Sequence, residues 1–370
     1  MENLVTKSSL EPYRYFRAAE CASHLMSVHQ SINNSVHLVE IKPESLKLWC
    51  PVDAVIAEDQ PAIEWMDLHG IDFREPFFNE TLARIDSKKR GRVLTTFDAL
   101  LQFEKICDGL SPSGFILHSS RCGSTLVANA CRAVKDSIVI AEAPVIDKLI
   151  TRFFTDGLSG SAKELLYKLL LRATVTALGQ RLKGDESHYF VKLACTSTLQ
   201  IYRLRCIWPD VPFVFLYRDP VETIVSNLLS IPEWMRAEVN PAAAAAIVGV
   251  DEEHVTSLGS EEYCARSLGR FFAAVDANFD SRMKLLNYEQ LSFDSLIAIL
   301  NFFGIDPTVD EADAVRKVSR LYSKDSTSTR VFEDDSSQKR SAASGETYIA
   351  AERWAQSSYD RLNARVLSCG

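Results

Sequence analysis

The segment Phe115-Ile-Leu-His-Ser-Ser-Arg-Cys-Gly-Ser-Thr-Leu-Val127 decides the fold of this chain. Its continuous apolar run, Phe115–His118, ends in a loop of small residues, and the loop leads directly into an amphipathic stretch with Leu126, Ala130 and Val134 on one face. Continuous apolarity is typical of a strand that is buried on both faces. The segment therefore predicts a buried strand, a tight loop and a helix.

Four further apolar runs repeat this pattern: Ser137–Ile140, Tyr189–Leu193, Phe213–Tyr217 and Met283–Asn287. Amphipathic stretches follow the last two, with Ile224, Leu228 and Leu229 and then Leu296, Ile299, Leu300 and Phe303 on their apolar faces. Strands that alternate with helices indicate βαβ units and a parallel sheet. We predict an α/β fold for residues 111–370, a P-loop-like three-layer sandwich with a central, mainly parallel five-stranded sheet flanked by helices.

Residues 1–110 have a different texture. Helical patterns and one strand-like run are punctuated by prolines, which keep the elements short. The helical patterns are Ala18–Gln30, Glu75–Ile85 and Thr96–Ile106, and the strand-like run is Ser35–Ile41. We predict a mixed, mostly helical accessory region with no recognisable chemistry of its own.

Composition excludes several classes of protein. The 370 residues are 46% hydrophobic and 24% charged, as in globular proteins, and their net charge of −8 disfavours a general nucleic-acid binder. The N-terminus lacks the apolar core of a secretory signal, and no stretch has the 18 or so apolar residues of a membrane span. The nine cysteines lack zinc-type spacing. We expect a soluble, cytoplasmic protein with reduced thiols, no metal, no nucleic-acid partner and no membrane contact.

The loop after the first strand has the composition of an anion cradle. Small residues let backbone N–H groups converge at a helix N-terminus, and they are Ser119, Ser120, Gly123, Ser124 and Thr125. Arg121 adds a forked cation that suits phosphate or sulfate. The loop is not a nucleotide-kinase P-loop, because His118 and Ser124 stand where that motif needs glycine and lysine. An ordinary turn with a surface arginine is the alternative.

A second candidate site follows the fourth strand. Arg218 stands at the carboxyl edge of that strand, Asp219 and Pro220 are suited to begin a helix, and Ser226 lies inside it. An arginine and a hydroxyl at this spacing can hold a second phosphate. The alternatives are a salt bridge from Arg218 to a neighbouring carboxylate and a solvent-facing Ser226.

Taken together, Arg121-Cys-Gly-Ser-Thr-Leu126, Tyr217-Arg-Asp-Pro220 with Ser226, and Tyr288-Glu-Gln-Leu291 resemble the motifs of PAPS-dependent sulfotransferases, in that family's order, over residues 113–305. PAPS is 3′-phosphoadenosine 5′-phosphosulfate. An arginine in the first loop, where cytosolic aryl and steroid enzymes usually have lysine, is similar to the tyrosylprotein branch and its bacterial-type relatives.

The resemblance implies a set of donor-binding residues. The 5′-phosphosulfate would be held by Ser120, Arg121, Cys122, Gly123, Ser124, Thr125 and Leu126, and the 3′-phosphate by Arg218 and Ser226. Tyr288 would lie near the adenine; a core aromatic is the alternative. Within the polar tail Thr327–Ala343, Lys339 and Arg340 would close on phosphate, assisted by Ser336 or Ser337; a solvated charge run is the alternative.

The resemblance also implies catalytic roles. Glu142 would be the general base, and Lys192 and Arg121 would stabilise charge on the leaving oxygen. The alternatives are a salt-bridged or capping Glu142 and a Lys192 that reaches solvent. The cytosolic branch uses a histidine near the end of the third strand, where this chain has none. We therefore interpret His118 as a loop-orienting residue at most and His188 as structural.

The predicted function is transfer of a sulfuryl group from PAPS, with PAP as product, to a hydroxyl or amine of a small soluble acceptor such as a natural product. Residues 1–110 and 230–265 would line the acceptor site. A phosphoryl-transfer enzyme on a related fold and a catalytically silent nucleotide-binding module are the alternatives.

Overall fold

The computed structural model describes residues 37–85, 89–155, 161–320 and 335–368. Its central sheet has the strand order β5-β6-β4-β7-β8, and every neighbouring pair is parallel. The strands are β4 (Gly114–His118), β5 (Ser137–Ala141), β6 (His188–Lys192), β7 (Phe213–Tyr217) and β8 (Met283–Asn287). All five apolar runs are therefore strands of one parallel sheet, as predicted.

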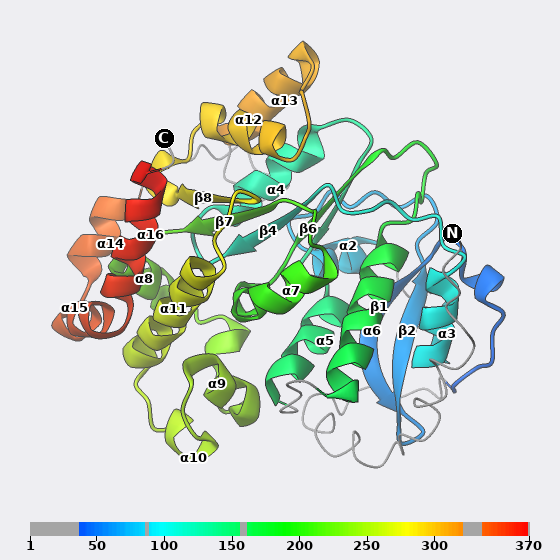
Figure 1. Ribbon diagram of the computed structural model, residues 1–370, viewed down its shortest axis with the longest axis horizontal. Helices are drawn as coiled ribbons and strands as arrows, with labels where there is room; N and C mark the ends of the chain where they lie inside the picture. Colours follow the sequence, from blue (N-terminus) through cyan, green and yellow to red (C-terminus); the bar gives the residue numbers. More distant parts are fainter. Residues whose placement is uncertain (1–36, 86–88, 156–160, 321–334, 369–370) are drawn as a thin grey trace, which may run out of the picture.

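Helices cover both faces of this sheet (Figure 1). They are α4 (Ser124–Ala133), α5 (Pro144–Thr155), α6 (Ala162–Leu178), α7 (Ile201–Ile207), α8 (Pro220–Leu229), α9 (Pro241–Val248), α10 (Glu252–Val255), α11 (Ser260–Ala277), α12 (Phe293–Phe302), α13 (Val309–Ser319), α14 (Ser336–Ala342), α15 (Gly345–Ala351) and α16 (Ser357–Ser368). Short 3-10 segments are η3 (Pro43–Leu46), η5 (Cys195–Gln200), η6 (Glu233–Met235) and η7 (Tyr288–Gln290), and a π-helical segment, η8 (Glu352–Gln356), joins α15 to α16.

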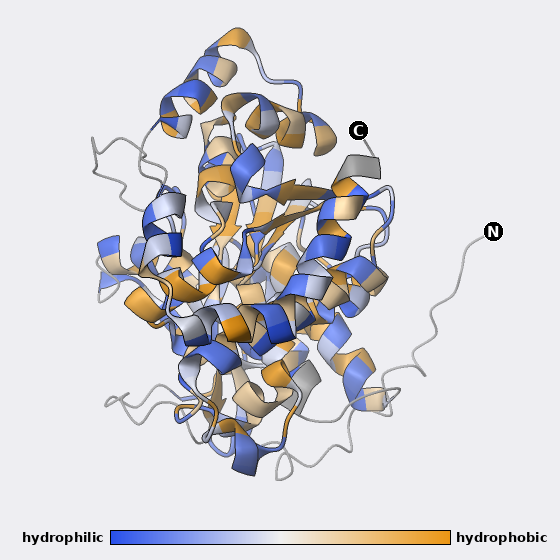
Figure 2. Ribbon diagram, turned by 90° about the vertical axis from the view of Figure 1, so that its left-hand side faces the viewer, coloured by the Kyte–Doolittle hydropathy of each residue, from blue (hydrophilic) through white to orange (hydrophobic). Residues whose placement is uncertain are grey.

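Successive residues of each strand point into different layers, because side chains alternate across a strand. Ile116 packs in a core with α4, α12 and α13, whereas Phe115 and Leu117 belong to a larger core on the other face. Figure 2 shows the strands in hydrophobic colours and many hydrophilic residues on the outer helices. The predicted three-layer sandwich is confirmed.

The helix faces predicted from sequence hold with one exception. Ile224 is fully buried and Leu228 is partly buried, but Leu229 is 76% exposed. At 3.6 residues per turn, Leu229 is rotated about 140° from Ile224, so it leaves the buried face that Ile224 and Leu228 share.

The region before residue 110 contains a three-stranded antiparallel sheet, β1 (Trp49–Ala57), β2 (Gln60–Asp67) and β3 (Arg92–Thr96), that the sequence analysis did not anticipate. Prolines led us to expect short elements, but Pro51 lies at a register shift of the edge strand β1 and Pro61 lies near the start of β2. Proline is tolerated at such positions. The region is mixed, as predicted, but among its described residues strands are as prominent as helices.

Both helices predicted in the described part of this region are present, α2 (Phe78–Arg84) and α3 (Phe97–Glu104). In the predicted strand Ser35–Ile41, Leu38 forms only an isolated bridge with Leu94, and its first two residues, like the predicted helix Ala18–Gln30, lie outside the described residues.

The N-terminal sheet shares a hydrophobic core with the layers of the central sheet. Leu46, Trp65 and Phe103 belong to the same cluster as Phe115 and Leu170 of α6. The predicted boundary near residue 110 therefore falls within one core, and the division into two domains stays a prediction. Within the described part of the chain, none of the helices combines the length and apolarity that crossing a bilayer requires.

Candidate active site

Four candidate side chains come from the carboxyl ends of four adjacent strands. His118 ends β4, Lys192 ends β6, Glu142 follows β5 and Arg218 follows β7. Parallel strands place these ends at one edge of the sheet, where α/β proteins bind ligands. The fold therefore brings together residues that are far apart in the sequence, in two clusters.

The loop between β4 and α4 has an unusual backbone. Ser120, Arg121 and Gly123 have φ values of 74°, 52° and 83°. The left-handed backbone at position 123 favours glycine, and a β-carbon there would lie 2.5 Å from Leu291 Cδ2, so that side chain would have to shift. Such turns direct backbone N–H groups into a concavity at the start of a helix. The predicted anion cradle thus has the expected backbone.

Asn227 of α8 holds this loop in place. Its side chain is buried, and its Oδ1 accepts hydrogen bonds from Ser120 Oγ (3.0 Å) and Arg121 Nε (3.3 Å). Arg121 also donates through Nη2 to the backbone carbonyl of Ser230 (2.7 Å), at the C-terminal end of α8. Arg121 is therefore directed toward α8 and not toward Glu142. Sequence reasoning missed Asn227, whose neighbour Ser226 was the only polar residue singled out there.

Three predicted loop residues differ in what they can offer a ligand. Cys122 is buried, its thiol donates to the Leu216 carbonyl (3.2 Å), and burial raises the pKa of the thiol. The side chain of Leu126 packs in the core below the loop. Cys122 can therefore contribute only its backbone N–H, and the backbone N–H of Leu126 already donates to the Gly123 carbonyl (2.9 Å). Ser124 also is buried, in the first turn of α4.

Glu142 and Lys192 are in direct contact, Lys192 Nζ donating to Glu142 Oε1. The Lys192 side chain is 1% exposed and that of Glu142 is 26% exposed. Burial alone would raise the pKa of Glu142, but Lys192 and His118 outweigh it and hold this pKa well below its usual range. The glutamate is thus ionised and salt-bridged, and the alternative of a Lys192 that reaches solvent is wrong.

His118 is the second group in contact with Glu142. Its Nε2 lies 3.3 Å from Glu142 Oε1, and its Nδ1 accepts the backbone N–H of Ser120 (3.1 Å). The sequence analysis gave His118 a loop-orienting role, and the hydrogen bond to Ser120 is of that kind. The contact with Glu142 was not foreseen, because spacing along the chain does not reveal which way a strand-end side chain points.

The N-terminal region reaches this cluster. Lys192 Nζ lies 4.9 Å from the centre of the Phe77 ring, which is partly buried just before α2.

A further group that the sequence did not indicate is Asp147, in the first turn of α5. Its Oδ1 is buried without a hydrogen-bond partner among the described residues. Burial and then the charge of Glu142 raise the pKa of Asp147 to about 8. Asp147 is therefore largely protonated at neutral pH.

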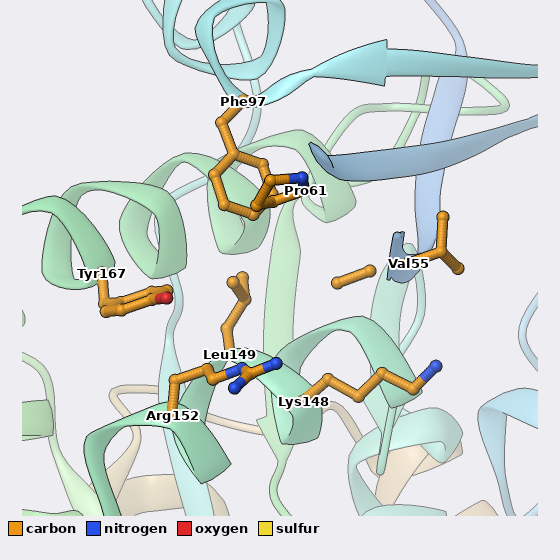
Figure 3. A pocket seen from close by; sticks show the side chains of 8 residues that line it. Val55, Pro61, Phe97, Lys148, Leu149, Arg152 and Tyr167 are labelled. Carbon is orange, nitrogen blue, oxygen red and sulfur yellow. The ribbon is translucent and has the colours of Figure 1, made fainter. Parts of the chain in front are cut away.

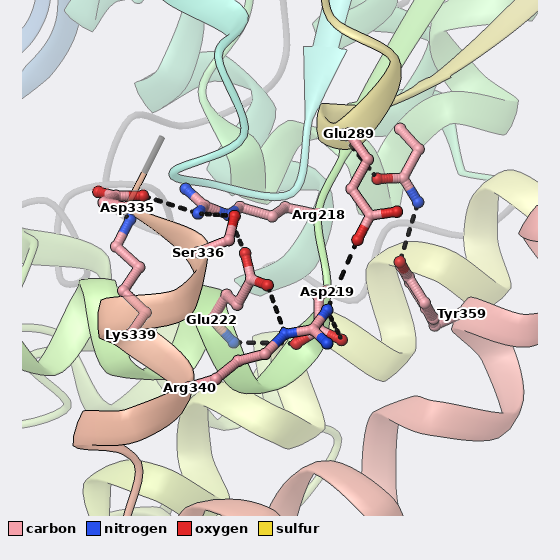
Figure 4. Close-up of polar contacts among 10 residues, drawn as sticks. Arg218, Asp219, Glu222, Glu289, Asp335, Ser336, Lys339, Arg340 and Tyr359 are labelled. Atoms are coloured by element: carbon pink, nitrogen blue, oxygen red, sulfur yellow. Dashed lines mark hydrogen bonds and ion pairs between the residues drawn. The ribbon is translucent and has the colours of Figure 1, made fainter. Parts of the chain in front are cut away.

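Arg218 is the centre of the second cluster (Figure 4). Its side chain is 3% exposed, and Nε donates to Glu222 Oε2 (2.7 Å). Its Nη2 donates to Asp335 Oδ1 (2.7 Å) and Ser336 Oγ (3.1 Å). The guanidinium lies 3.9 Å from the centre of the Tyr288 ring, a cation–π distance. The salt-bridge alternative for Arg218 is what this structure shows, with two carboxylates.

The C-terminal tail supplies further cations to this cluster. Lys339 is buried and donates to Asp335 Oδ2 (2.8 Å), while Arg340 Nε donates to Glu222 Oε1 (2.7 Å). The solvated-run alternative is therefore wrong for Lys339. Ser336 contacts Arg218 whereas Ser337 is exposed, and residues 327–334 of the predicted tail lie outside the described residues.

Helix α8 links the two clusters. Asp219 caps it by accepting the backbone N–H of Glu222 (3.0 Å), as predicted, with Pro220 in its first turn. Ser226 is partly buried one turn beyond Glu222. The same helix thus carries Glu222, which contacts Arg218, and Asn227, which contacts the β4–α4 loop.

Two cavities lie outside these clusters. One has about 20 Å³, room for roughly one water molecule, and is lined by Ala54, Val55, Pro61, Phe97, Lys148, Leu149, Arg152 and Tyr167 (Figure 3). The other, of about 350 Å³, lies between α12 and α13 and includes the carboxylates Asp294 and Asp306. The first is too small for a nucleotide, and the second offers an anion only repulsion. Among the described residues there is no group of three or more potential metal ligands.

Comparisons with known proteins give structural neighbours only. No family model and no curated protein matches the chain. Similar solved structures include sulfotransferase STF9 from Mycobacterium avium (13% identity, 60% of this chain, 71% of that chain, TM-score 0.37). They also include sulfotransferase STF1 from Mycobacterium tuberculosis H37Rv (17%, 59%, 76%, 0.35) and a sulfotransferase from Alicyclobacillus acidocaldarius (15%, 66%, 96%, 0.32). These identities and TM-scores are too low to establish an activity, so the residues of the two clusters must carry it.

Proposed function

We propose that this chain is a PAPS-dependent sulfotransferase that transfers a sulfuryl group to a hydroxyl or amine of a small acceptor. The observation that carries the proposal is the presence of two cation-bearing clusters at one edge of a parallel sheet, linked by α8. PAPS has anionic groups at both ends of its adenosine. A site with two separate cationic positions suits this ligand better than a nucleotide with one phosphorylated end.

In this proposal the β4–α4 loop binds the 5′-phosphosulfate. The backbone N–H groups of residues 121–125 and the hydroxyls of Ser124 and Thr125 would bind it at the start of α4. Arg121 would turn from its contact with Ser230 toward the phosphosulfate. Arg218 and Ser226 bind the 3′-phosphate, with Lys339 and Arg340 of α14 beside them. Tyr288, already against Arg218, borders the adenine.

The proposed reaction is an in-line displacement at sulfur. The acceptor oxygen or nitrogen forms a bond to sulfur while the bond from sulfur to the bridging oxygen of PAPS breaks, and PAP leaves with the electron pair. Lys192 stabilises the charge that develops on the bridging oxygen, as cations do in phosphoryl transfer. The proton of the acceptor moves to Glu142, which later releases it to water.

The salt bridge between Lys192 and Glu142 fits this division of labour. An ionised Glu142 can accept a proton, but a cation in contact makes it a weak base. When Lys192 shifts toward the bridging oxygen, Glu142 loses that stabilisation and becomes a stronger base. The contact of Lys192 with Phe77 supports our proposal that the region before residue 110 lies on the acceptor side.

The two alternatives make different predictions. A phosphoryl-transfer enzyme is disfavoured because Ser124 replaces the lysine of the nucleotide-kinase P-loop. A silent nucleotide-binding module would bind PAPS without turnover. Glu142 and Lys192 argue against such a silent module, because nucleotide binding alone requires neither residue.

A calorimetric titration with 3′,5′-ADP (PAP) and with 5′-AMP tests the donor assignment, and we expect PAP to bind about 10- to 100-fold more tightly because only PAP reaches Arg218. Equal affinities would contradict the proposal. Radiolabelled PAPS offered with a panel of phenols, alcohols and amines then tests transfer. PAP binding with no transfer to any panel member would favour the silent module.

A further inference from the structure

We propose that His118 is a positioning residue that connects the phosphate-binding loop to the general base, so that the base is oriented only when the loop is formed. The inference deepens the proposed function and rests on it, because it takes Glu142 as the base. It is carried by two contacts on opposite sides of one imidazole ring, to Ser120 and to Glu142.

The loop side of the ring is firmly held. His118 is buried at the end of β4, and its Nδ1 accepts the backbone N–H of Ser120 at 3.1 Å. The His118 carbonyl accepts from Thr198 Oγ1 (3.4 Å), and the next backbone N–H, of Ser119, donates to the Leu216 carbonyl (2.9 Å). Since Nδ1 is an acceptor, the ring proton of neutral His118 must be on Nε2.

The other side of the ring then faces the base. Nε2 of His118 lies 3.3 Å from Glu142 Oε1, the same oxygen that accepts from Lys192. Because both contacts are to Oε1, Oε2 is the oxygen of this carboxylate that can face an acceptor. In this proposal the His118 contact fixes which oxygen accepts the proton, and it tightens into a hydrogen bond when Lys192 moves toward the leaving group.

The loop side of the ring also reports on donor binding. The Ser120 N–H that Nδ1 accepts directly precedes the N–H groups proposed to bind the 5′-phosphate. A phosphate bound to those groups would place negative charge beside this hydrogen bond without replacing it. Occupation of the loop should thus change the environment of Nδ1 while Nε2 keeps its proton toward Glu142.

Two substitutions separate the two ends of the ring. In His118→Asn the amide oxygen lies near the position of Nδ1, which keeps an acceptor for Ser120 and removes the donor to Glu142. In His118→Gln the amide nitrogen reaches the position of Nε2, which keeps the donor and removes the acceptor. His188→Asn is the matched control, because His188 is also a strand histidine but stands at the amino end of β6.

With the acceptor found in the radiolabel screen, we expect His118→Asn to lower kcat by at least about 10-fold, the effect of losing one hydrogen bond to a charged group, with PAP affinity kept within about threefold. Losing a donor to the carboxylate raises the pKa of Glu142, so the acid limb of the kcat–pH profile should move to higher pH. Lys192 on β6, Asp147 on α5 and Cys195 on η5 also surround Glu142 and are unchanged in all variants.

His118→Gln should keep the acid limb in place and weaken PAP binding several-fold, and His188→Asn should change neither quantity. An unshifted acid limb in His118→Asn, or identical profiles for the two His118 variants, would overturn the proposal. Circular dichroism would identify a misfolded variant. The tautomer of His118 can be measured by NMR without any variant being active.

Nitrogen-15 NMR of the histidines in the whole chain, assigned with the His118 variants, reads the tautomer directly. We expect Nε2–H for His118 and a change in the Nδ1 shift on adding PAP. An Nδ1–H tautomer in a chain that prefers PAP over 5′-AMP would overturn this proposal alone. An Nε2–H tautomer in a chain without that preference would overturn the PAPS assignment and leave the contact intact.

Discussion

The two clusters of the candidate site are built in different ways. Glu142, Lys192 and His118 come from the ends of β5, β6 and β4, so the sheet itself sets their positions. Arg218 follows β7. One of its partners lies on the adjacent helix α8, and another lies at the start of α14, which is far along the chain. Both clusters pair a buried cation with carboxylates. Only the second cluster includes a residue from the C-terminal segment. There Asp335 forms an ion pair with Arg218, the cation that we propose binds phosphate.

Under the proposed function, this difference separates a site for chemistry from a site for recognition. The first cluster needs fixed geometry, because a proton and a leaving oxygen must be handled within hydrogen-bond reach. The second must exchange Asp335 for a phosphate group without losing the fold. Substitutions in the first cluster should therefore change turnover, and those in the second should change affinity.

The largest effect is expected for Glu142→Gln. The amide cannot accept the acceptor proton, so kcat should fall by about 10²- to 10⁴-fold while PAP affinity stays near that of the wild type. The measurement is radiolabel transfer together with calorimetric PAP titration. Glu346→Gln, at an exposed position on α15, is the matched control. Turnover similar to that of the wild type would reject Glu142 as the base.

The next effect is expected for Arg218→Ala. PAP affinity should fall by about 10- to 100-fold because charge-assisted hydrogen bonds to phosphate are lost, while 5′-AMP affinity should change little. Removal of Arg218 also takes one of its two cationic partners from the buried Glu222, which keeps Arg340, so Arg218→Lys serves as a second variant that keeps the charge. Equal losses for both nucleotides would count against a 3′-phosphate role.

A smaller effect, on stability, is expected for Asp147→Asn. The pKa of Asp147 in the folded chain, about 8, is raised above the value of about 4 in the unfolded chain. Between these pH values the unfolded chain releases the proton and the folded chain keeps it. The contribution of this carboxyl to the stability of the fold therefore falls as pH rises from about 4 to 8. Asparagine removes this dependence. Thermal unfolding from pH 5 to pH 8 should show the wild type losing about 3–4 kcal/mol relative to the variant; parallel curves would contradict a protonated Asp147.

The smallest effect is expected for Asp335→Asn. In this structure Asp335 accepts from Arg218 and Lys339, and a phosphate must displace it. Because the Asp335 side chain is 43% exposed, the contribution of these ion pairs is modest. We expect PAP to bind about threefold more tightly to the variant, with 5′-AMP unchanged. Weaker PAP binding would mean that Asp335 organises α14 for the ligand and does not compete with it.

The sequence predicted the parts of this molecule that local pattern determines. Continuous apolar runs located all five strands of the central sheet, and Asp219 with Pro220 located the start of α8. The antiparallel N-terminal sheet was missed because Pro51 and Pro61 are compatible with strands only at a bulge or near an end, which the sequence does not show.

In the candidate site, residue types were easier to predict than contacts. Glu142 and Lys192 were assigned separate roles, but their direct contact depends on the pairing of β5 with β6. The contact of Arg218 with Asp335 joins residues 117 positions apart, and that of His118 with Glu142 depends on side-chain direction. No spacing rule covers either, so both required the structure.

Helix α8 has one further consequence. It holds the β4–α4 loop through Asn227 and Arg218 through Glu222, positions five residues apart on one helix. At 1.5 Å per residue, these two attachment points are separated by about 7.5 Å along the helix axis. A continuous helix stretches and bends little, so α8 fixes the distance between these two attachment points. It would select nucleotides by the distance between their two anionic ends as well as by charge, and a ligand with a longer or shorter separation would engage only one of them.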